Sequence, residues 1–216
     1  MRALITSRRA WCWAAVVWLA GCSTLPRPPQ AVTRYDLGAP AALAVPPAVA
    51  LPAVALGPVQ APLLSDGSTL VHYRLAYADA QVLRAYTQAR WSVPPAQMVQ
   101  QRLREHLTQG GRVVLSAAPG EALPSVQGRR VPVLRLALEE FSHVFTTAQD
   151  SVGWVRVRAT LVDPAPQGDV LLAQRVLEVR QPASAPNAAA GVQALAQGVD
   201  GLGAELAQWL HIVSKR

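Results

Sequence analysis

The sequence predicts an α/β fold, a three-layer-like sandwich with a mixed, largely antiparallel sheet and two main helices. Three consecutive segments in the second half alternate apolar and polar residues with period two, which is typical of strands: 133–145, 152–162 and 170–180. The turn-forming sequence DPAPQGD at 163–169 separates the last two, so these segments predict an antiparallel meander. Two stretches with apolar residues three or four positions apart predict the helices.

Shorter signals predict the strands of the first half. Tyr35–Gly38 reads as the end of a first strand, and Val49–Val59 and Thr69–Leu75 read as two more. Pro52 would put the second of these at an edge or a bulge. The segment Val82–Trp91 alternates as a strand does, but a helix of that length fits almost as well, so both readings stay open.

The two helices have recognisable beginnings and ends. Pro94 and Pro95 suit a first helical turn before residues 97–109, where Val99, Leu103 and Leu107 form an apolar stripe and Arg102 lies off it. Gly110 and Gly111 then end the helix, before a short strand at 112–116 and a polar loop at 117–130. The closing helix has Asn187 as N-cap and an apolar stripe that reaches Val213. Its glycines at 198, 201 and 203 favour close packing against the sheet.

The N-terminal stretch predicts export and a lipid anchor. Residues 1–9 carry three arginines and no acid, and an uncharged run at 10–20 is too short to span a membrane but suits a secretory signal. Leu19-Ala20-Gly21-Cys22 resembles the bacterial lipobox, in which the cysteine is acylated and becomes the first mature residue. The alternative is an ordinary secretory signal with a chance cysteine. We therefore expect a signal peptide at 1–21, a Pro-rich tether at 22–33 and one domain at 34–216.

A lipidated Cys22 would hold the mature protein on a membrane, because several acyl chains anchor stably where one does not. Ser23 is similar to the residue that follows the cysteine in outer-membrane lipoproteins. The sequence thus predicts attachment to the periplasmic face of the outer membrane. Cys12 lies in the predicted signal and Cys22 would be lipidated, so we expect no disulfide in the mature domain.

Composition argues against several functions. Removing residues 1–21 leaves 195 residues with 17 basic and 13 acidic side chains, and without a basic run this modest excess argues against nucleic-acid binding.

The four histidines, His72, His106, His143 and His211, have no metal-ligand spacing and read as surface or structural residues. Glu139 and Glu140 are neighbours on a predicted strand and should point to opposite faces. No nucleophile motif or phosphate-binding loop is found, so we expect neither an enzyme nor a cofactor.

Arginines and aromatic residues recur together on the predicted strands. They read either as a polar outer face of the sheet with cross-strand pairs or as a recognition surface, because both residue types are enriched at interfaces. The candidate partner-binding residues are Tyr73, Arg74, Arg90, Trp91, Trp154, Arg156 and Arg158.

Several segments together resemble the ABC-type transport auxiliary lipoproteins, which include the paraquat-inducible PqiC type. They follow the lipobox in order: YDLG at 35–38, LVHYR at 70–74, ARWSVPP at 89–95, LALEEFSHVF at 136–145, QPA at 181–183 and AGVQAL at 190–195, with Trp209 near the end. The Ala/Pro linker at 39–47 is longer than the family's, and residues 62–65 lack an aromatic that the family would have.

The resemblance implies a non-enzymatic component of an intermembrane phospholipid transport system. Such systems pair an ATPase and a permease with an MCE-domain protein that crosses the periplasm, and the lipoprotein would tether that protein to the outer membrane. Since MCE proteins form rings, we expect a matching homo-oligomeric ring. The rival hypotheses are an assembly or pilot lipoprotein of another envelope machine, such as a secretin or a lipopolysaccharide-export helper, and a periplasmic hydrolase using Glu139, Glu140 or a histidine.

Overall fold

The structure is a computed structural model that describes residues 31–40, 51–62, 64, 67–120, 122, 124–165 and 167–215. Residues Val32–Arg216 form one compact unit. The predicted signal peptide, Cys22, the first residues of the tether and most of the Ala/Pro linker lie outside the described residues.

The described unit contains ten strands and two helices. The strands are β1 (Thr33–Tyr35), β2 (Leu51–Leu56), β3 (Leu70–Leu75), β4 (Asp79–Trp91), β5 (Arg112–Ser116), β6 (Ser125–Val126), β7 (Arg129–Arg130), β8 (Val133–Phe145), β9 (Ser151–Asp163) and β10 (Val170–Pro182). The helices are α2 (Pro95–Gln109) and α3 (Ala188–Val213). This is an α/β sandwich, as the sequence predicts.

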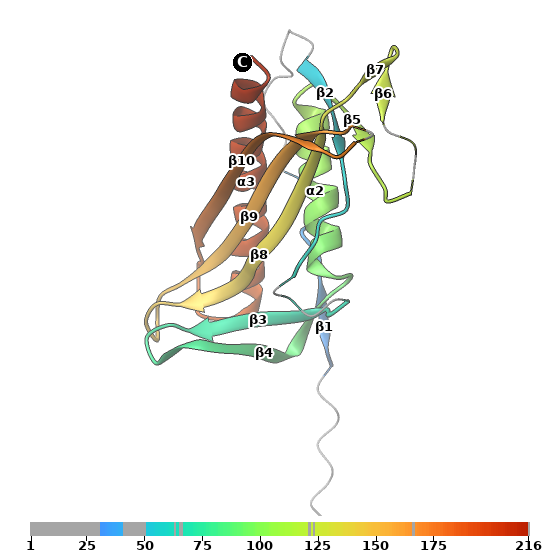
Figure 1. Cartoon of the computed structure of the whole chain (residues 1–216). Helices are drawn as coiled ribbons and strands as arrows, with labels where there is room; N and C mark the ends of the chain where they lie inside the picture. Colours follow the sequence, from blue (N-terminus) through green and yellow to red (C-terminus); the bar gives the residue numbers. More distant parts are fainter. Residues whose placement is uncertain are drawn as a thin grey trace, which may run out of the picture. The chain divides into compact units, whose positions relative to one another are not determined.

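The long strand β8 is the centre of the main sheet (Figure 1). On one side it pairs along its length with antiparallel β9, which pairs with antiparallel β10, so the predicted meander is confirmed. On its other side β8 pairs in parallel with β2 near its start and with β3 near its end. β5 extends the sheet beyond β2, and β4 and then β1 extend it beyond β3. The sheet is therefore mixed, with its longest pairings antiparallel.

The segment that sequence patterning left ambiguous is a strand. β4 pairs with antiparallel β3 and, through Ala89–Trp91, with parallel β1. Tertiary pairing on both sides decides the conformation here, because alternation over ten residues alone does not separate a strand from a short helix.

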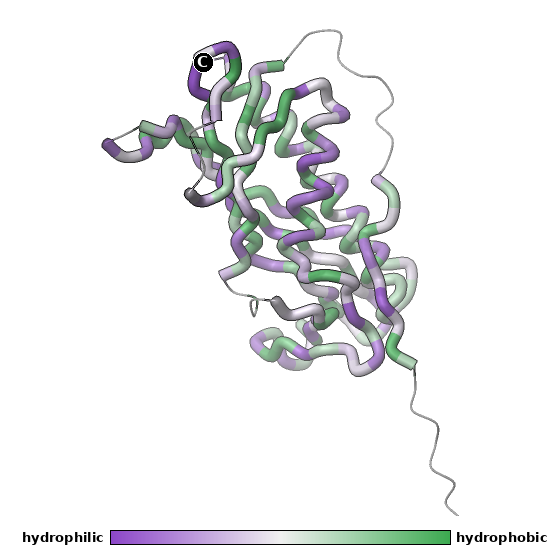
Figure 2. Tube along the Cα trace, turned by 90° about the vertical axis from the view of Figure 1, so that its right-hand side faces the viewer, coloured by the Kyte–Doolittle hydropathy of each residue, from purple (hydrophilic) through white to green (hydrophobic). Residues whose placement is uncertain are grey.

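Both helices cover the same face of the sheet and lie side by side (Figure 1). Met98, Val99, Leu103 and Leu107 of α2 and the apolar stripe of α3 pack on the inward residues of the strands. The alternation of hydrophobic and hydrophilic residues that makes this packing possible is visible along the chain in Figure 2. The predicted inward residues of β9, from Val155 to Leu161 at every second position, are all buried.

Glycines let α3 approach the strands closely, as the sequence predicts. A Cβ at Gly198 would lie 3.1 Å from the Val155 side chain, and one at Gly191 would lie 2.3 Å from Nδ1 of His143. On the strand side, a Cβ at Gly153 would lie 2.6 Å from the backbone of Ala194. The helix and the sheet therefore touch through positions that have no side chain.

The opposite face of the sheet carries a smaller buried cluster at one end. Ala55, Val131, Val133 and Val162 pack there against Val126 of β6. β6 and β7 form a small hairpin inside the stretch predicted as an irregular loop. Its turn residues Gln127 and Gly128 have φ of 51° and 73°, the left-handed conformation that two-residue hairpin turns require.

A bulge in β10 corrects one sequence prediction. Period two places Leu171 on the same face as Ala173, but the pairing with β9 shifts between these two residues. Leu172 is the extra residue, so Leu171 points to the opposite face and is 61% exposed.

Candidate functional site

A second bulge, in β8, brings two carboxylates to one face of the sheet. Leu138 pairs with Val157 and Glu140 with Arg156, so Glu139 is an extra residue in the strand. The expectation that Glu139 and Glu140 point to opposite faces is therefore wrong, because a bulge interrupts the period of two. Both reach arginines on the face that the helices leave open.

These carboxylates and three arginines form what we call the arginine–glutamate network: Arg74, Glu139, Glu140, Arg156 and Arg158. Nη2 of Arg74 donates to Glu140 at 3.1 Å, and Nε of Arg158 donates to Glu139 at 2.7 Å. Nε of Arg156 lies 3.0 Å from Oε2 of Glu139, an ion pair without hydrogen-bond geometry. The glutamate side chains are 13% and 11% exposed and those of Arg156 and Arg158 are 40% and 48% exposed, so the network presents guanidinium groups to solvent.

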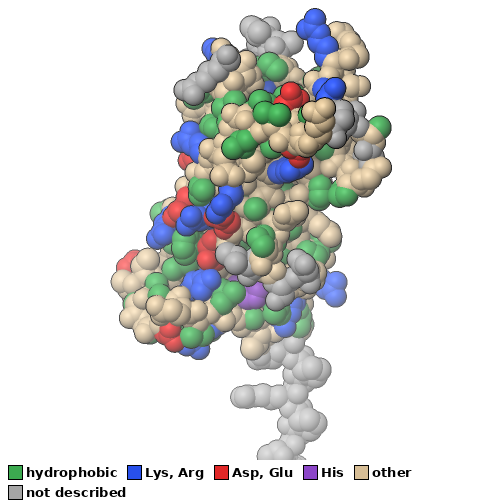
Figure 3. Space-filling view, viewed as in Figure 1, with side chains coloured by type: hydrophobic (Ala, Val, Ile, Leu, Met, Phe, Trp, Pro, Cys, Tyr) green, Lys and Arg blue, Asp and Glu red, His purple; other side chains and the backbone are tan. Residues whose placement is uncertain are grey.

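Charged side chains gather over the middle of the helix-free face (Figure 3), the face that carries the network. Trp154 precedes Arg156 by two positions on β9. The guanidinium carbon of Arg180 from β10 lies 4.3 Å from the centroid of the Trp154 ring. His72 borders the network, and burial is the main cause that lowers its pKa, opposed by Glu140 and reinforced by Arg74. Four of the candidate residues, Arg74, Trp154, Arg156 and Arg158, thus share this face.

Tyr73 lies on the opposite face from its neighbour Arg74. Its ring packs against Tyr86 and Phe145, and the Tyr86 hydroxyl lies 2.8 Å from Nδ1 of His143. His143 is fully buried, and burial lowers its pKa to about 4, so its imidazole is neutral at pH 7. Burial also raises the pKa of Tyr86. This pair is a polar contact inside the domain, beneath α3.

The other two candidates have structural contacts. Trp91 is 2% exposed and packs on Phe141, so its ring is part of the core. Arg90 lies where β4 bulges away from β3, and it donates to the carbonyls of Tyr86 at 2.7 Å and Ala89 at 2.8 Å. Its side chain is therefore bound to the backbone of its own strand.

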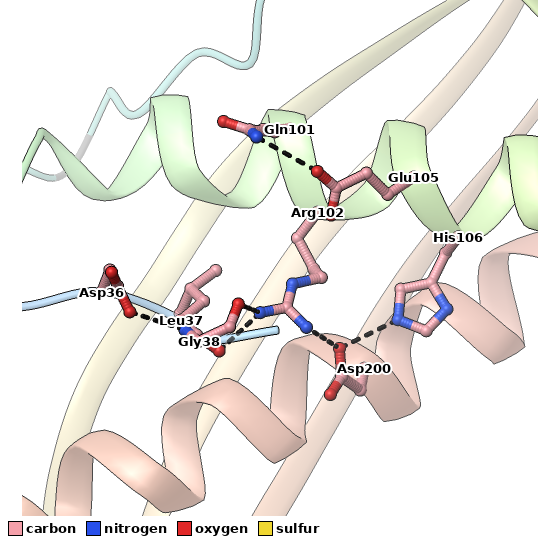
Figure 4. Close-up of polar contacts among 8 residues, drawn as sticks. All are labelled: Asp36, Leu37, Gly38, Gln101, Arg102, Glu105, His106 and Asp200. Carbon is pink, nitrogen blue, oxygen red and sulfur yellow. Dashed lines mark hydrogen bonds and ion pairs between the residues drawn. The ribbon is translucent and has the colours of Figure 1, made fainter. Parts of the chain in front are cut away.

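A polar contact between the helices has no counterpart in the sequence analysis (Figure 4). The sequence predicts that Arg102 of α2 lies off the apolar stripe. In the structure Arg102 is 3% exposed and pairs with Asp200 of α3 at 3.1 Å. Its second nitrogen donates to the carbonyls of Leu37 and Gly38, just after β1. Nε2 of His106 lies 2.9 Å from the same Asp200 oxygen. We call Arg102, His106 and Asp200 the helix clasp, which also fixes the entry of the chain into the domain.

The histidines of the described part of the chain have structural contacts or are exposed. No three potential metal-ligating side chains cluster among these residues. His106 and His143 have the structural contacts given above, and His211 is exposed near the end of α3. Within the same residues, no helix has the length and apolar character needed to cross a membrane. The network is a set of ion pairs within the sheet.

Comparison with known proteins assigns the family. Residues 35–207 match the family described as ABC-type transport auxiliary lipoprotein component. The chain belongs to this family. The resemblance seen in the sequence is thereby confirmed, and the family is one of transport components rather than enzymes. No curated protein matches the chain.

Solved structures support the fold. A crystal structure of a Xanthomonas campestris protein has a TM-score of 0.66 at 19% identity, over 85% of this chain and 97% of that one. A crystal structure of an uncharacterized protein has a TM-score of 0.59 at 15% identity, over 83% of this chain and 99% of the other. At these identities the likeness concerns the fold alone.

Proposed function

We propose that this protein is a non-enzymatic lipoprotein, anchored by Cys22 in the outer membrane, that tethers the MCE-domain protein of an ABC-type phospholipid transport system. The observation that carries the proposal is the family match over residues 35–207, behind a lipobox-like LAGC at 19–22. The described domain supports it with a hydrophobic core between the helices and the sheet and with an arginine-rich face that the helices leave open.

The helix-free face is our candidate for the partner interface. Arg156 and Arg158 keep exposed donors although Glu139 pairs with both, and Trp154 with its stacked Arg180 adds a flat amphipathic surface. Arginine and tryptophan are the residue types most enriched at the centres of protein interfaces. Because Glu139 and Glu140 already orient the guanidinium groups, the arginine side chains would lose little further entropy when a partner binds them.

The edge of the sheet at β10 is our candidate for contacts between copies of the lipoprotein. β10 is a 13-residue edge strand, and Val170, Leu171, Leu172 and Val176 on it are all more than two-fifths exposed. A long apolar edge strand pairs readily with another chain. We propose that copies of the lipoprotein associate through it in a ring, and sedimentation velocity of the purified protein measures this directly.

Capture of the partner tests the interface. Lipidated protein should recover an MCE-domain protein from solubilised envelopes, and R156Q/R158Q should recover it at least tenfold less. R84Q/R129Q removes the same charge from two exposed arginines outside both the network and β10 and should leave recovery unchanged. Thermal melts of both doubles check their folding, because R156Q/R158Q leaves the 13% exposed Glu139 without its arginine partners.

Other outcomes contradict parts of the proposal. Repeated recovery of secretin or lipopolysaccharide-export components instead of an MCE protein would favour the assembly-lipoprotein alternative. Equal recovery by R156Q/R158Q and the wild type would place the interface elsewhere on the domain.

A further inference from the structure

An apolar cavity of about 380 Å³ lies between the C-terminal end of α3 and the sheet. Its wall comes from β2, β5, β9, β10 and α3, and the apolar side chains that line it include Val54, Leu161, Leu172, Ala173, Leu210 and Val213. The size is within the range of about 300–1,000 Å³ that small-molecule sites have. Among its lining residues only Arg112 and Ser214 have polar side chains.

Arg112 is the unusual member of this wall. The residue is 3% exposed, and its Nη1 donates to the carbonyl of Pro52 at 2.5 Å. Its Nη2 is buried and has no hydrogen-bond partner. No acidic residue lines the cavity, and burial lowers the pKa of the Arg112 guanidinium. A buried cation that lacks an anionic partner is costly, so this site favours an anion.

The β10 bulge shapes the mouth of the cavity. Leu172, the extra residue of the bulge, lines the cavity while remaining 47% exposed. Leu171 and Val170 beside it are also exposed. Ser214, the other polar lining residue, already donates its hydroxyl to the carbonyl of Leu210 at 2.6 Å. Arg112 is thus the one lining side chain in the described structure with a free strong donor.

We propose that this cavity binds a single-chain anionic lipid, with the acyl chain among the leucine and valine side chains and the acid group on Arg112. The lining fits an aliphatic chain because it is apolar and contains no aromatic residue to recognise a ring. Nη2 is shielded from solvent, so the head group reaches it when side chains at the mouth move aside. Arg112 is the one cationic side chain among the lining residues, which assigns the head group to the Arg112 end of the cavity.

This inference does not rest on the tethering role. A domain that holds no MCE protein would still contain the cavity, and a tether would still function with the cavity blocked. Failure of one proposal therefore leaves the other standing.

Titration calorimetry with oleate, using the chain from Ser23 onward, tests the proposal. That chain includes the compact unit Val32–Arg216 with its whole described core. Oleate should bind saturably at one site per chain. R112Q should weaken oleate binding by about tenfold to a hundredfold, the usual range for a hydrogen bond to a charged group, and should leave oleyl alcohol binding unchanged. Lysophosphatidylglycerol as a second titrant separates the sources: tighter binding of oleate assigns a free fatty acid, and tighter binding of the lysolipid assigns a membrane lipid.

Two variants at exposed positions separate a loss of oleate binding from misfolding. L172E places a negative charge at the mouth and should weaken oleate binding at least tenfold. V176E changes a similarly exposed apolar residue on the same edge strand, away from the cavity, and should bind oleate as the wild type does. Absence of saturable oleate binding to the wild type, or equal binding by the wild type, R112Q and L172E, would overturn the proposal.

Discussion

Buried His143 should make the domain lose stability as the pH falls from 6.5 to 4. Its imidazole is fully buried beside Tyr86, and burial lowers its pKa from 6.5 to about 4. In the unfolded chain the same side chain takes up a proton near pH 6.5. Between these two values the unfolded state binds more protons than the folded state, so the free energy of unfolding decreases as pH decreases.

The size of this effect follows from the pKa difference. One pKa unit corresponds to about 1.4 kcal/mol, so about 3 kcal/mol is lost by pH 4, and the loss is complete only below that pH. Between pH 7.5 and pH 5 the loss is about 2 kcal/mol. That is a large share of the 5–15 kcal/mol that domains typically have.

Guanidinium chloride unfolding at pH 7.5 and pH 5 measures the effect. H143Q keeps a neutral side chain that can accept from the Tyr86 hydroxyl, and it removes the titration. The wild type should lose about 2 kcal/mol more than H143Q does over this interval. The other titrating groups are the same in both proteins and cancel in the comparison. If the two proteins lose equal stability, the buried neutral imidazole is the wrong explanation.

Two further predictions concern the packing of α3. G191A should destabilise the domain by about 2 kcal/mol or more despite alanine's better helix propensity, because the new Cβ meets the His143 ring; G201A, whose Cβ would lie 3.8 Å from its nearest neighbour, should be neutral or slightly stabilising in thermal melts. D200N should cost about 2 kcal/mol in the same assay by leaving the buried Arg102 without its anionic partner, and an unchanged melting temperature would show that the helix clasp contributes nothing.

Periodic features of this fold could be predicted from the sequence. The meander from β8 to β10 and the apolar stripes of both helices follow from spacing alone, because a repeat over a dozen residues is hard to produce by chance. The glycines of α3 also indicated close packing correctly. Spacing cannot predict where such a pattern is interrupted. The bulges at Glu139 and Leu172 are each a single extra residue, and the position of each depends on the partner strand.

The candidate surface was predicted in part. Alternation along β9 identifies Arg156 and Arg158, which follow Trp154, and the structure places them with Arg74 on one face. Arg102 was misassigned for a physical reason: a charged residue normally lies off the apolar stripe, and only the contacts of Asp200 and the carbonyls after β1 make its burial tolerable. Arg112, whose Nη2 has no hydrogen-bond partner, gives no signal in the sequence, since it looks like any arginine at the start of a strand.

The distribution of the MCE-domain protein between the two membranes tests the tethering proposal most directly. In cells with the wild-type lipoprotein, part of the MCE protein should sediment with outer membranes on a density gradient. In cells with C22A that part should return to the inner-membrane fractions, while the unanchored lipoprotein still recovers the MCE protein in a pull-down. An MCE protein whose distribution is the same in both strains would contradict the account.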